Sequence, residues 1–203
     1  MRWMLTGLFL VTCATGLRAQ ESAWGPRVGV DLAAQSFGDI GANLTDWKFG
    51  YLAGLAGDHD FGNRFHLLTE FLYIKKGTRT RDAATRTTGY TTLNYLEADV
   101  LGKFDLTGNN EGLFMTLGPT FSYFMGGRVR NVMDGQETTD YKVNGSDLNR
   151  RFEVGGAVGI GFDLKSWVLE FRGQTGFTAI DQAGQVRNVV LGAHFTRYFR
   201  KGE

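Results

Sequence analysis

Apolar and polar residues alternate with a period of two along much of the chain, and residues 94–106 show this most clearly. One face of this stretch carries Leu96, Ala98, Val100, Gly102 and Phe104, and the other carries Tyr95, Glu97, Asp99, Leu101 and Lys103. This period predicts a β-strand with one apolar face. In a soluble domain that face packs on a core, whereas in a membrane barrel it contacts lipid and the charged face lines the lumen. The stretch alone does not decide between the two.

The same alternation recurs in seven other stretches, and turn residues separate them. The predicted strands are residues 27–35, 48–58, 65–76, 94–106, 113–126, 152–164, 167–177 and 187–199. Their apolar faces carry large side chains, while the opposite faces are rich in Gly, Ala, Ser, Thr and charged residues. A narrow membrane barrel fills its lumen in this way. The sequence therefore predicts an all-β fold of eight antiparallel strands.

The connections between the predicted strands alternate between long and short. Residues 36–47, 77–90, 127–151 and 178–185 are long, whereas "FGNR", "TGNNEG" and "DLKSW" mark short turns. Outer-membrane barrels have short periplasmic turns and long outer loops. Aromatic residues near the strand ends, such as Trp47 and Trp167, are typical of interfacial girdles. We therefore predict an up-and-down transmembrane β-barrel in the cell outer membrane, with its apolar faces toward lipid.

The first 19 residues have the layout of a secretory signal peptide. A basic Arg2 precedes an apolar run, and small or polar residues follow it as far as Ala19. This pattern predicts a signal peptide at 1–19, cleavage before Gln20 and a barrel domain at 20–203. Cys13 is the one cysteine of the chain. Its lipidation, in place of cleavage after Ala19, is the alternative that the motif leaves open.

Composition and motifs narrow the classes of function. The net charge is only +1, so the sequence lacks the excess of basic residues that is typical of nucleic-acid-binding proteins. The sequence contains no G-x-S-x-G, P-loop or H-E-x-x-H motif. The three histidines, His59, His66 and His194, lack metal-ligand spacing, and "GGAVGIG" is interpreted as small lumen-facing residues of a strand. We expect neither an enzyme nor a bound metal or cofactor.

One constellation of charged side chains is predicted to point into the lumen. It consists of Glu70, Glu97, Asp99, Lys103, Glu153, Asp163, Glu170 and Arg172. Charges inside a narrow barrel must pair or meet water, because isolated burial is costly. Two roles follow: a salt-bridge network that plugs a closed barrel, or a charged constriction that selects ions. An eight-stranded barrel is just wide enough for side chains, which favours the plug.

A polar loop carries a second set of candidates, the basic residues Arg79, Arg81 and Arg86. Besides the outer-membrane lipid itself, the expected partners are lipopolysaccharide headgroups or another envelope protein. A plain solvated loop is the alternative, since loops are usually polar. We expect the protein to be a monomer.

Five segments of the chain follow a recurrent pattern in order: "LLTEFLYIKKG", "YLEADVLGKF", "LGPTFSYFMGG", "FEVGGAVGIGFDL" and "VLEFRGQTGFTAI". Together they resemble the porin-type outer-membrane β-barrel family of Bacteroidota that is called PorT-like. The resemblance implies an eight-stranded barrel with a structural, adhesive or secretion-associated role through its outer loops. The chain departs from the pattern at its end, where "RKGE" follows Phe199, and at Thr69, where a proline is expected.

Two other functions remain as alternatives. A narrow porin-like channel would use the same barrel with a conducting lumen. A soluble, exported lipocalin-like barrel would turn every strand around, with its apolar faces inward and a small apolar ligand inside.

Overall fold

The computed structural model describes residues 21–38, 45–108, 111–148, 150–181 and 185–199, so the predicted signal peptide and Cys13 lie outside it. The described residues form nine strands: β1 (Glu21–Phe37), β2 (Lys48–Asp60), β3 (Phe65–Asp82), β4 (Thr87–Asp105), β5 (Gly112–Met133), β6 (Gln136–Val143), β7 (Phe152–Leu164), β8 (Trp167–Gly176) and β9 (Val186–Arg197). Within the same ranges, no helix is long and apolar enough to cross a membrane.

Eight of these strands close into a ring. Its order is β1-β2-β3-β4-β5-β7-β8-β9, with every pair antiparallel, and β1 closes the ring by pairing with both β2 and β9. Val28 of β1, for example, lies opposite Ala53 on one side and Phe195 on the other. The predicted eight-stranded antiparallel barrel is therefore confirmed. β6 is an additional strand that pairs with the distal part of β5.

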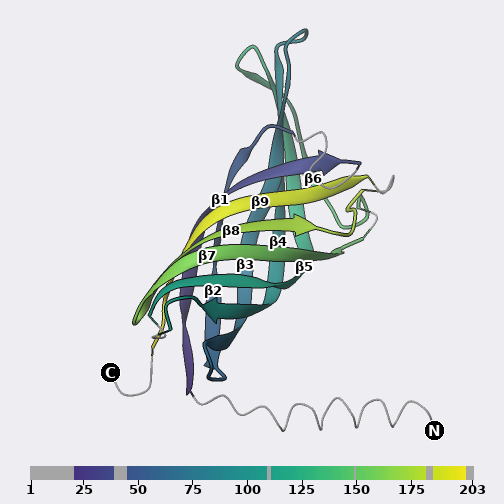
Figure 1. Cartoon of the computed structure of the whole chain (residues 1–203). Coiled ribbons are helices and arrows are strands. Elements are labelled where there is room, and N and C mark those ends of the chain that lie inside the picture. The colour runs from purple at the N-terminus through teal and green to yellow at the C-terminus, as the bar shows by residue number, and fades with distance from the viewer. Residues whose placement is uncertain (1–20, 39–44, 109–110, 149, 182–184, 200–203) are drawn as a thin grey trace, which may run out of the picture.

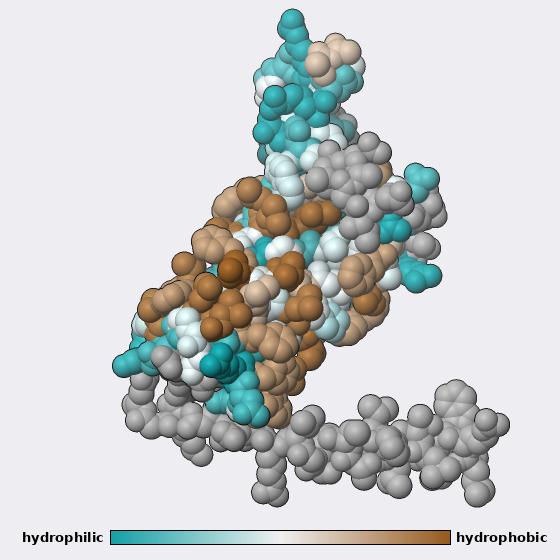
Figure 2. Space-filling model, viewed as in Figure 1, coloured by the Kyte–Doolittle hydropathy of each residue, from teal (hydrophilic) through white to brown (hydrophobic). Residues whose placement is uncertain are grey.

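Burial alternates along the strands, and the apolar faces point outward. Phe49 is 65% exposed and Leu117 63%, whereas Glu97 and Lys103, on the inner face, are 1% and 3% exposed. Figure 2 shows the resulting hydrophobic band on the visible face of the barrel, with hydrophilic surface above and below it. A soluble barrel needs the opposite orientation, so the lipocalin-like alternative is wrong. Ala34 is an exception: the period of two in the predicted strand 27–35 places it on the apolar face with Val28, Val30 and Leu32, but it is fully buried where the chain at Thr45 folds back onto Gln35.

The two ends of the barrel differ. Segments 61–64, 106–111 and 165–166 connect strands at one end, where β1 also begins and β9 ends and where Trp24 bridges to Phe199. We call this the short-turn end. At the other end, called the long-loop end, two hairpins rise well beyond the barrel (Figure 1).

These hairpins correct the prediction that 77–90 and 127–151 are loops. β3 and β4 stay paired as far as Asp82 and Thr87, and β5 continues to Met133 before turning into β6. Residues 78–82 of β3, 87–91 of β4, 128–133 of β5 and all of β6 form a four-stranded sheet, here called the outer sheet. At its base the β4–β5 register shifts beside Asn94, where Gly126 has a φ of +156° that favours glycine.

The interior of the barrel is layered along its axis. Near the long-loop end lies an apolar cluster, formed by Ala33, Leu52, Leu72, Ile74, Leu93, Tyr95, Phe124, Val143, Ile180 and Val190. A smaller cluster lies near the short-turn end and consists of Ala23, Ala56, Phe114, Val168 and Tyr198. Charged side chains fill the space between these two clusters.

Candidate functional site

Arg172 of β8 occupies the centre of the buried charges. Its Nη1 and Nη2 lie 2.7 and 2.8 Å from the two carboxylate oxygens of Glu70 on β3, which is a bidentate pair. Nη2 also lies 2.8 Å from Glu170 Oε2, and Nη1 lies 3.3 Å from Asp99 Oδ2. All four side chains are 0–2% exposed. One guanidinium therefore joins three carboxylates from β3, β4 and β8.

Arg27 of β1 extends this central group toward β9. It forms a close ion pair with Glu170, and its Nη1 donates to Thr196 Oγ1 at 2.9 Å. Its Nη2 lies 3.0 Å from His194 Nδ1, and His194 Nε2 lies 2.9 Å from Asp31 Oδ1. The central group thus reaches five strands of the ring: β1, β3, β4, β8 and β9.

A second group lies closer to the long-loop end and is organised by Lys76 of β3. Lys76 Nζ lies 2.7 Å from Glu97 Oε2 on β4 and 3.4 Å from Glu153 Oε1 on β7. Gln174 Nε2 donates to Glu97 at 2.8 Å, and Asn188 Nδ2 donates to Glu153 at 2.6 Å. Each carboxylate therefore receives a cation and at least one neutral donor.

A third group lies closer to the short-turn end, around Lys103 of β4. Lys103 Nζ lies 2.8 Å from Asp58 Oδ2 on β2 and 2.7 Å from Asp163 Oδ2 on β7. His66 Nδ1 lies 2.7 Å from Asp58 Oδ1, and the Lys103 ammonium also lies 4.9 Å from the centroid of the Phe114 ring. This group bridges opposite parts of the lumen above the smaller apolar cluster.

All eight predicted lumen residues are buried, and they fall into these three groups. Sequence reasoning missed most of their partners, notably Arg27, Asp31, Asp58 and Lys76. Arg27 and Asp31 alternate with the outward Val28, Val30 and Leu32 of the same strand, so the period of two was the available signal. Each histidine has a hydrogen-bond partner: His59 with Ser22 and Thr69, His66 with Asp58, and His194 with Asp31.

Small residues make the space that these side chains occupy. A Cβ added at Gly159 of β7 would lie 2.4 Å from Glu170 Oε1 and 2.5 Å from Thr116 Oγ1. One added at Gly192 of β9 would lie 1.9 Å from Asp31 Oδ1. The "GGAVGIG" stretch is therefore part of a strand, and its inward Gly159 leaves room for the buried Glu170 carboxylate.

The interior holds more acids than bases. Among the described residues, nine carboxyl side chains and four Lys or Arg side chains are buried; the acids are Asp31, Asp58, Glu70, Glu97, Asp99, Asp105, Glu153, Asp163 and Glu170, and the bases are Arg27, Lys76, Lys103 and Arg172. No group of three or more His, Cys, Asp or Glu residues with the geometry to hold a metal ion occurs in this part of the chain.

The predicted basic residues of the outer loop lie in the β3–β4 hairpin. Arg79 and Arg81 are strand residues of β3, which corrects their assignment to a loop, and Arg86 is in the turn with a φ of +51°. The Arg79 guanidinium lies 5.8 Å from the centroid of the Tyr90 ring on β4. Arg86 Nη1 lies 3.9 Å from Asp134 Oδ1 in the neighbouring β5–β6 turn. The three arginines do not converge on one site.

Comparison with known proteins places this geometry in a family. The protein-family model called outer membrane protein beta-barrel domain matches residues 18–182 of this chain. The chain belongs to that family. Its location is the outer membrane, so the long-loop end is the outer end and the short-turn end is periplasmic.

Solved structures share the fold at low sequence identity. Neisserial surface protein A is 12% identical, with a TM-score of 0.52 over 89% of this chain and all of that chain. The attachment invasion locus protein Ail of Yersinia pestis is 13% identical, with a TM-score of 0.48 and the same coverage. No curated protein sequence matches this chain.

Proposed function

We propose that this outer-membrane protein is a closed, non-conducting barrel that displays the outer sheet as an adhesive surface. One observation carries the proposal: the sheet continues from the barrel into two paired hairpins beyond the apolar belt, so the barrel serves as a rigid base for them. Binding residues are commonly held above a rigid scaffold in this way.

β6 is the part of the outer sheet best suited to bind a partner. Its residues from Gln136 to Lys142 are all exposed, and the strand pairs with β5 along one side. Tyr141 is 53% exposed and Met133, at the end of β5, is 45% exposed. An exposed strand edge with aromatic and apolar side chains can accept an extended segment from another protein by strand addition. The proposed partner is therefore a protein of the cell exterior.

The buried network supports the non-conducting part of the proposal. Ion pairs cross the lumen between β3 and β8, β3 and β7, and β4 and β7, and their side chains are 0–3% exposed. The apolar cluster lies between them and the outer end. The excess of buried acids is the one observation that favours the alternative, a narrow cation-selective channel.

Two measurements test the proposal. The mature chain, folded into a planar lipid bilayer, is expected to give no conductance steps, and voltage-stable cation-selective steps would establish the channel instead.

Bacteria that display the full chain are expected to adhere to protein-coated surfaces. In two shortened variants, Asn-Gly replaces residues 81–88 or 132–138, because Thr80–Gly89 and Asn131–Thr139 are paired positions that a two-residue turn can join.

The shortening of β5–β6 removes Met133 and the outer half of the β6 edge, so it is expected to weaken adhesion more than the shortening of β3–β4. A heat-dependent shift on SDS gels would show that both shortened barrels still fold. Unchanged adhesion in the folded β5–β6 variant would refute the adhesive role.

The finer resemblance to PorT-like proteins of Bacteroidota, with a role in secretion, stays a prediction. The expectation that the protein is a monomer and not an enzyme also stays a prediction.

A further inference from the structure

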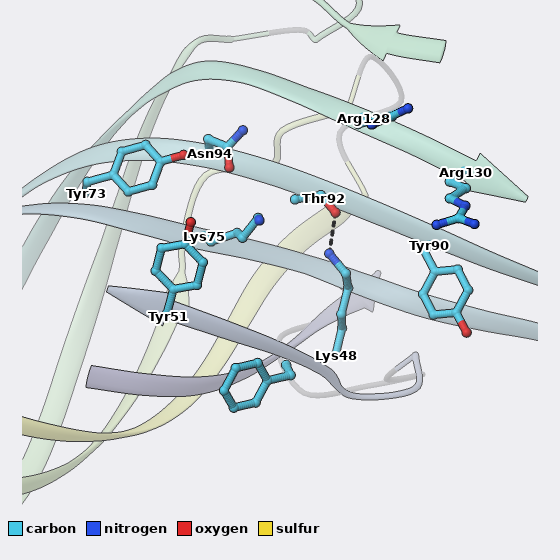
Figure 3. Close-up of a pocket in the computed structure, with 10 residues that line it drawn as sticks. Lys48, Tyr51, Tyr73, Lys75, Tyr90, Thr92, Asn94, Arg128 and Arg130 are labelled. Carbon is cyan, nitrogen blue, oxygen red and sulfur yellow. Dashed lines mark hydrogen bonds between the residues drawn. The ribbon is translucent and has the colours of Figure 1, made fainter. Parts of the chain in front are cut away.

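A groove on the outside of the barrel lies at the base of the outer sheet and is separate from the lumen network. It has a volume of about 680 Å³ and is lined by Lys48, Phe49, Tyr51, Tyr73, Lys75, Tyr90, Thr92, Asn94, Arg128 and Arg130. Figure 3 shows these side chains along β2, β3, β4 and β5. Such a volume accommodates one phosphorylated sugar ring or a lipid headgroup of similar size.

The groove lies where the regular pairing of β2 with β3 ends. Their pairing ends at Leu52 and Ile74, whereas β3 and β4 stay paired to the top of the hairpin. Residues 48–51 have no ladder partner on β3, although Gly50 stays beside the Lys75 carbonyl and Asp46 bridges to Arg79. The side chain of Lys48 spans the opening and donates a hydrogen bond to Thr92 Oγ1 on β4 (Figure 3).

The groove faces the membrane interface rather than the lumen. Tyr51 and Tyr73 are 44% and 37% exposed and lie on the same outward faces as Leu55 and Phe71 of the apolar belt. Leu52, Leu72 and Ile74 alternate with them and are buried inside. Tyrosine rings are typical of the headgroup level of a membrane, since they have an apolar body and a polar tip. The groove thus lies where the apolar belt gives way to the outer sheet.

The charges that line the groove are of one sign. Lys48, Lys75, Arg128 and Arg130 contribute four cations, and none of its ten lining residues is acidic. The arginines already have carboxylate partners on β6, because Arg128 pairs with Asp140 and Arg130 Nε lies 3.0 Å from Glu137 Oε2. The lysines contact uncharged groups instead. Lys48 donates a hydrogen bond to the Thr92 hydroxyl, and Lys75 Nζ lies 5.1 Å from the centroid of the Tyr51 ring.

We infer that this groove binds the phosphate group of an outer-leaflet lipid headgroup, with Lys48 and Lys75 as its principal ligands. Lysine ammonium groups bind phosphate as point charges, and the Thr92 hydroxyl and Asn94 amide supply further hydrogen bonds. The sideways opening makes a lipid headgroup the occupant, because at this height the nearest anions belong to the leaflet. Phe49, 65% exposed, lies beside the lysines, where it contacts the apolar part of the same lipid.

The test uses the mature chain in phosphatidylcholine nanodiscs, with or without bisphosphorylated lipid A, and native mass spectrometry to count retained lipid. We expect retention of lipid A and its loss, by about tenfold or more, in K48Q/K75Q, which removes two charge-assisted contacts. The variant R64Q/K165Q removes two cations from the periplasmic turns and is expected to retain lipid A as the parent chain does.

K75Q alone covers the case in which the double variant fails to fold, which the heat-dependent gel shift detects, and a several-fold loss of lipid A is expected from it. Three outcomes would overturn the inference: equal retention in the folded lysine variants, equal retention of dephosphorylated lipid A, or full displacement by millimolar inorganic phosphate. The last would indicate a general anion site. None of these readouts depends on adhesion, so the inference and the adhesive role fail independently.

Discussion

Arg172 of β8 and Glu70 of β3 meet across the full width of the barrel, because four positions separate the two strands in the ring of eight. Their two N–O distances of 2.7 and 2.8 Å make a bidentate pair between residues 102 positions apart in the sequence. Since the pair is fully buried and shares Glu170 with Arg27, it ties together opposite walls of the lumen.

Removal of Arg172 is expected to destabilise the barrel strongly. Arg172→Met leaves Glu70, Glu170 and Asp99 without their shared cation, and breaking a buried pair costs about 3–5 kcal/mol. Urea unfolding in lipid vesicles, followed by tryptophan fluorescence, measures this loss. The triple variant R172M/E70Q/D99N also removes two of the carboxylates that Arg172 neutralised, while Glu170 keeps its ion pair with Arg27, and it should recover part of the lost stability. A triple variant no more stable than R172M would contradict the electrostatic explanation.

Gly159 is expected to tolerate no branched side chain. Gly159→Val places its Cβ against Glu170 and Thr116, and Glu170 has no free direction to move because Arg27 and Arg172 hold it. Overpacking of this kind costs about 1–3 kcal/mol in the free energy of unfolding. The neighbouring Ile160→Val, on the lipid-facing side, serves as the matched control and should cost less. Equal stability of the two variants would argue against a tightly filled lumen.

Charge on the outer face of β7 is expected to cost free energy according to depth. Val158 lies near the middle of the strand and Leu164 at its periplasmic end, and both are more than half exposed. Val158→Arg should destabilise the folded barrel by about 2–4 kcal/mol, and Leu164→Arg by about 0–1 kcal/mol. Unfolding in vesicles checks both values. Equal costs would mean that this face does not cross the hydrocarbon in the expected way.

The Arg128–Asp140 pair is expected to make the outer sheet sensitive to acid. A hydrogen bond from the Arg128 guanidinium holds the pKa of the Asp140 carboxyl below its usual value. Because the folded pKa is lowered, the contribution of this pair is fully present above the unfolded pKa and is lost as pH falls through the folded pKa. NMR titration of the Asp140 side chain should give a lower midpoint than in R128Q, and matching midpoints would exclude the pairing.

The sequence by itself determined the strands of the barrel and the orientation of their faces. Its period of two separated Leu96, Ala98 and Val100 from Glu97, Asp99 and Lys103, and the alternating connection lengths indicated which face meets lipid. These features are local: each follows from residues close together in the chain and from the solvent they contact. The burial of all eight predicted charges follows from the same alternation.

Only the tertiary structure decided which charges meet and where the outer sheet begins. The pairing of Arg172 with Glu70 depends on ring closure and strand register, which bring together residues that no short pattern relates. In residues 77–90 both faces are polar, because water surrounds the hairpin, so no alternation distinguishes a strand from a loop there. β6 was missed for the same reason. The groove of Lys48 and Lys75 likewise arises where the regular pairing of β2 with β3 ends, a feature of register rather than of composition.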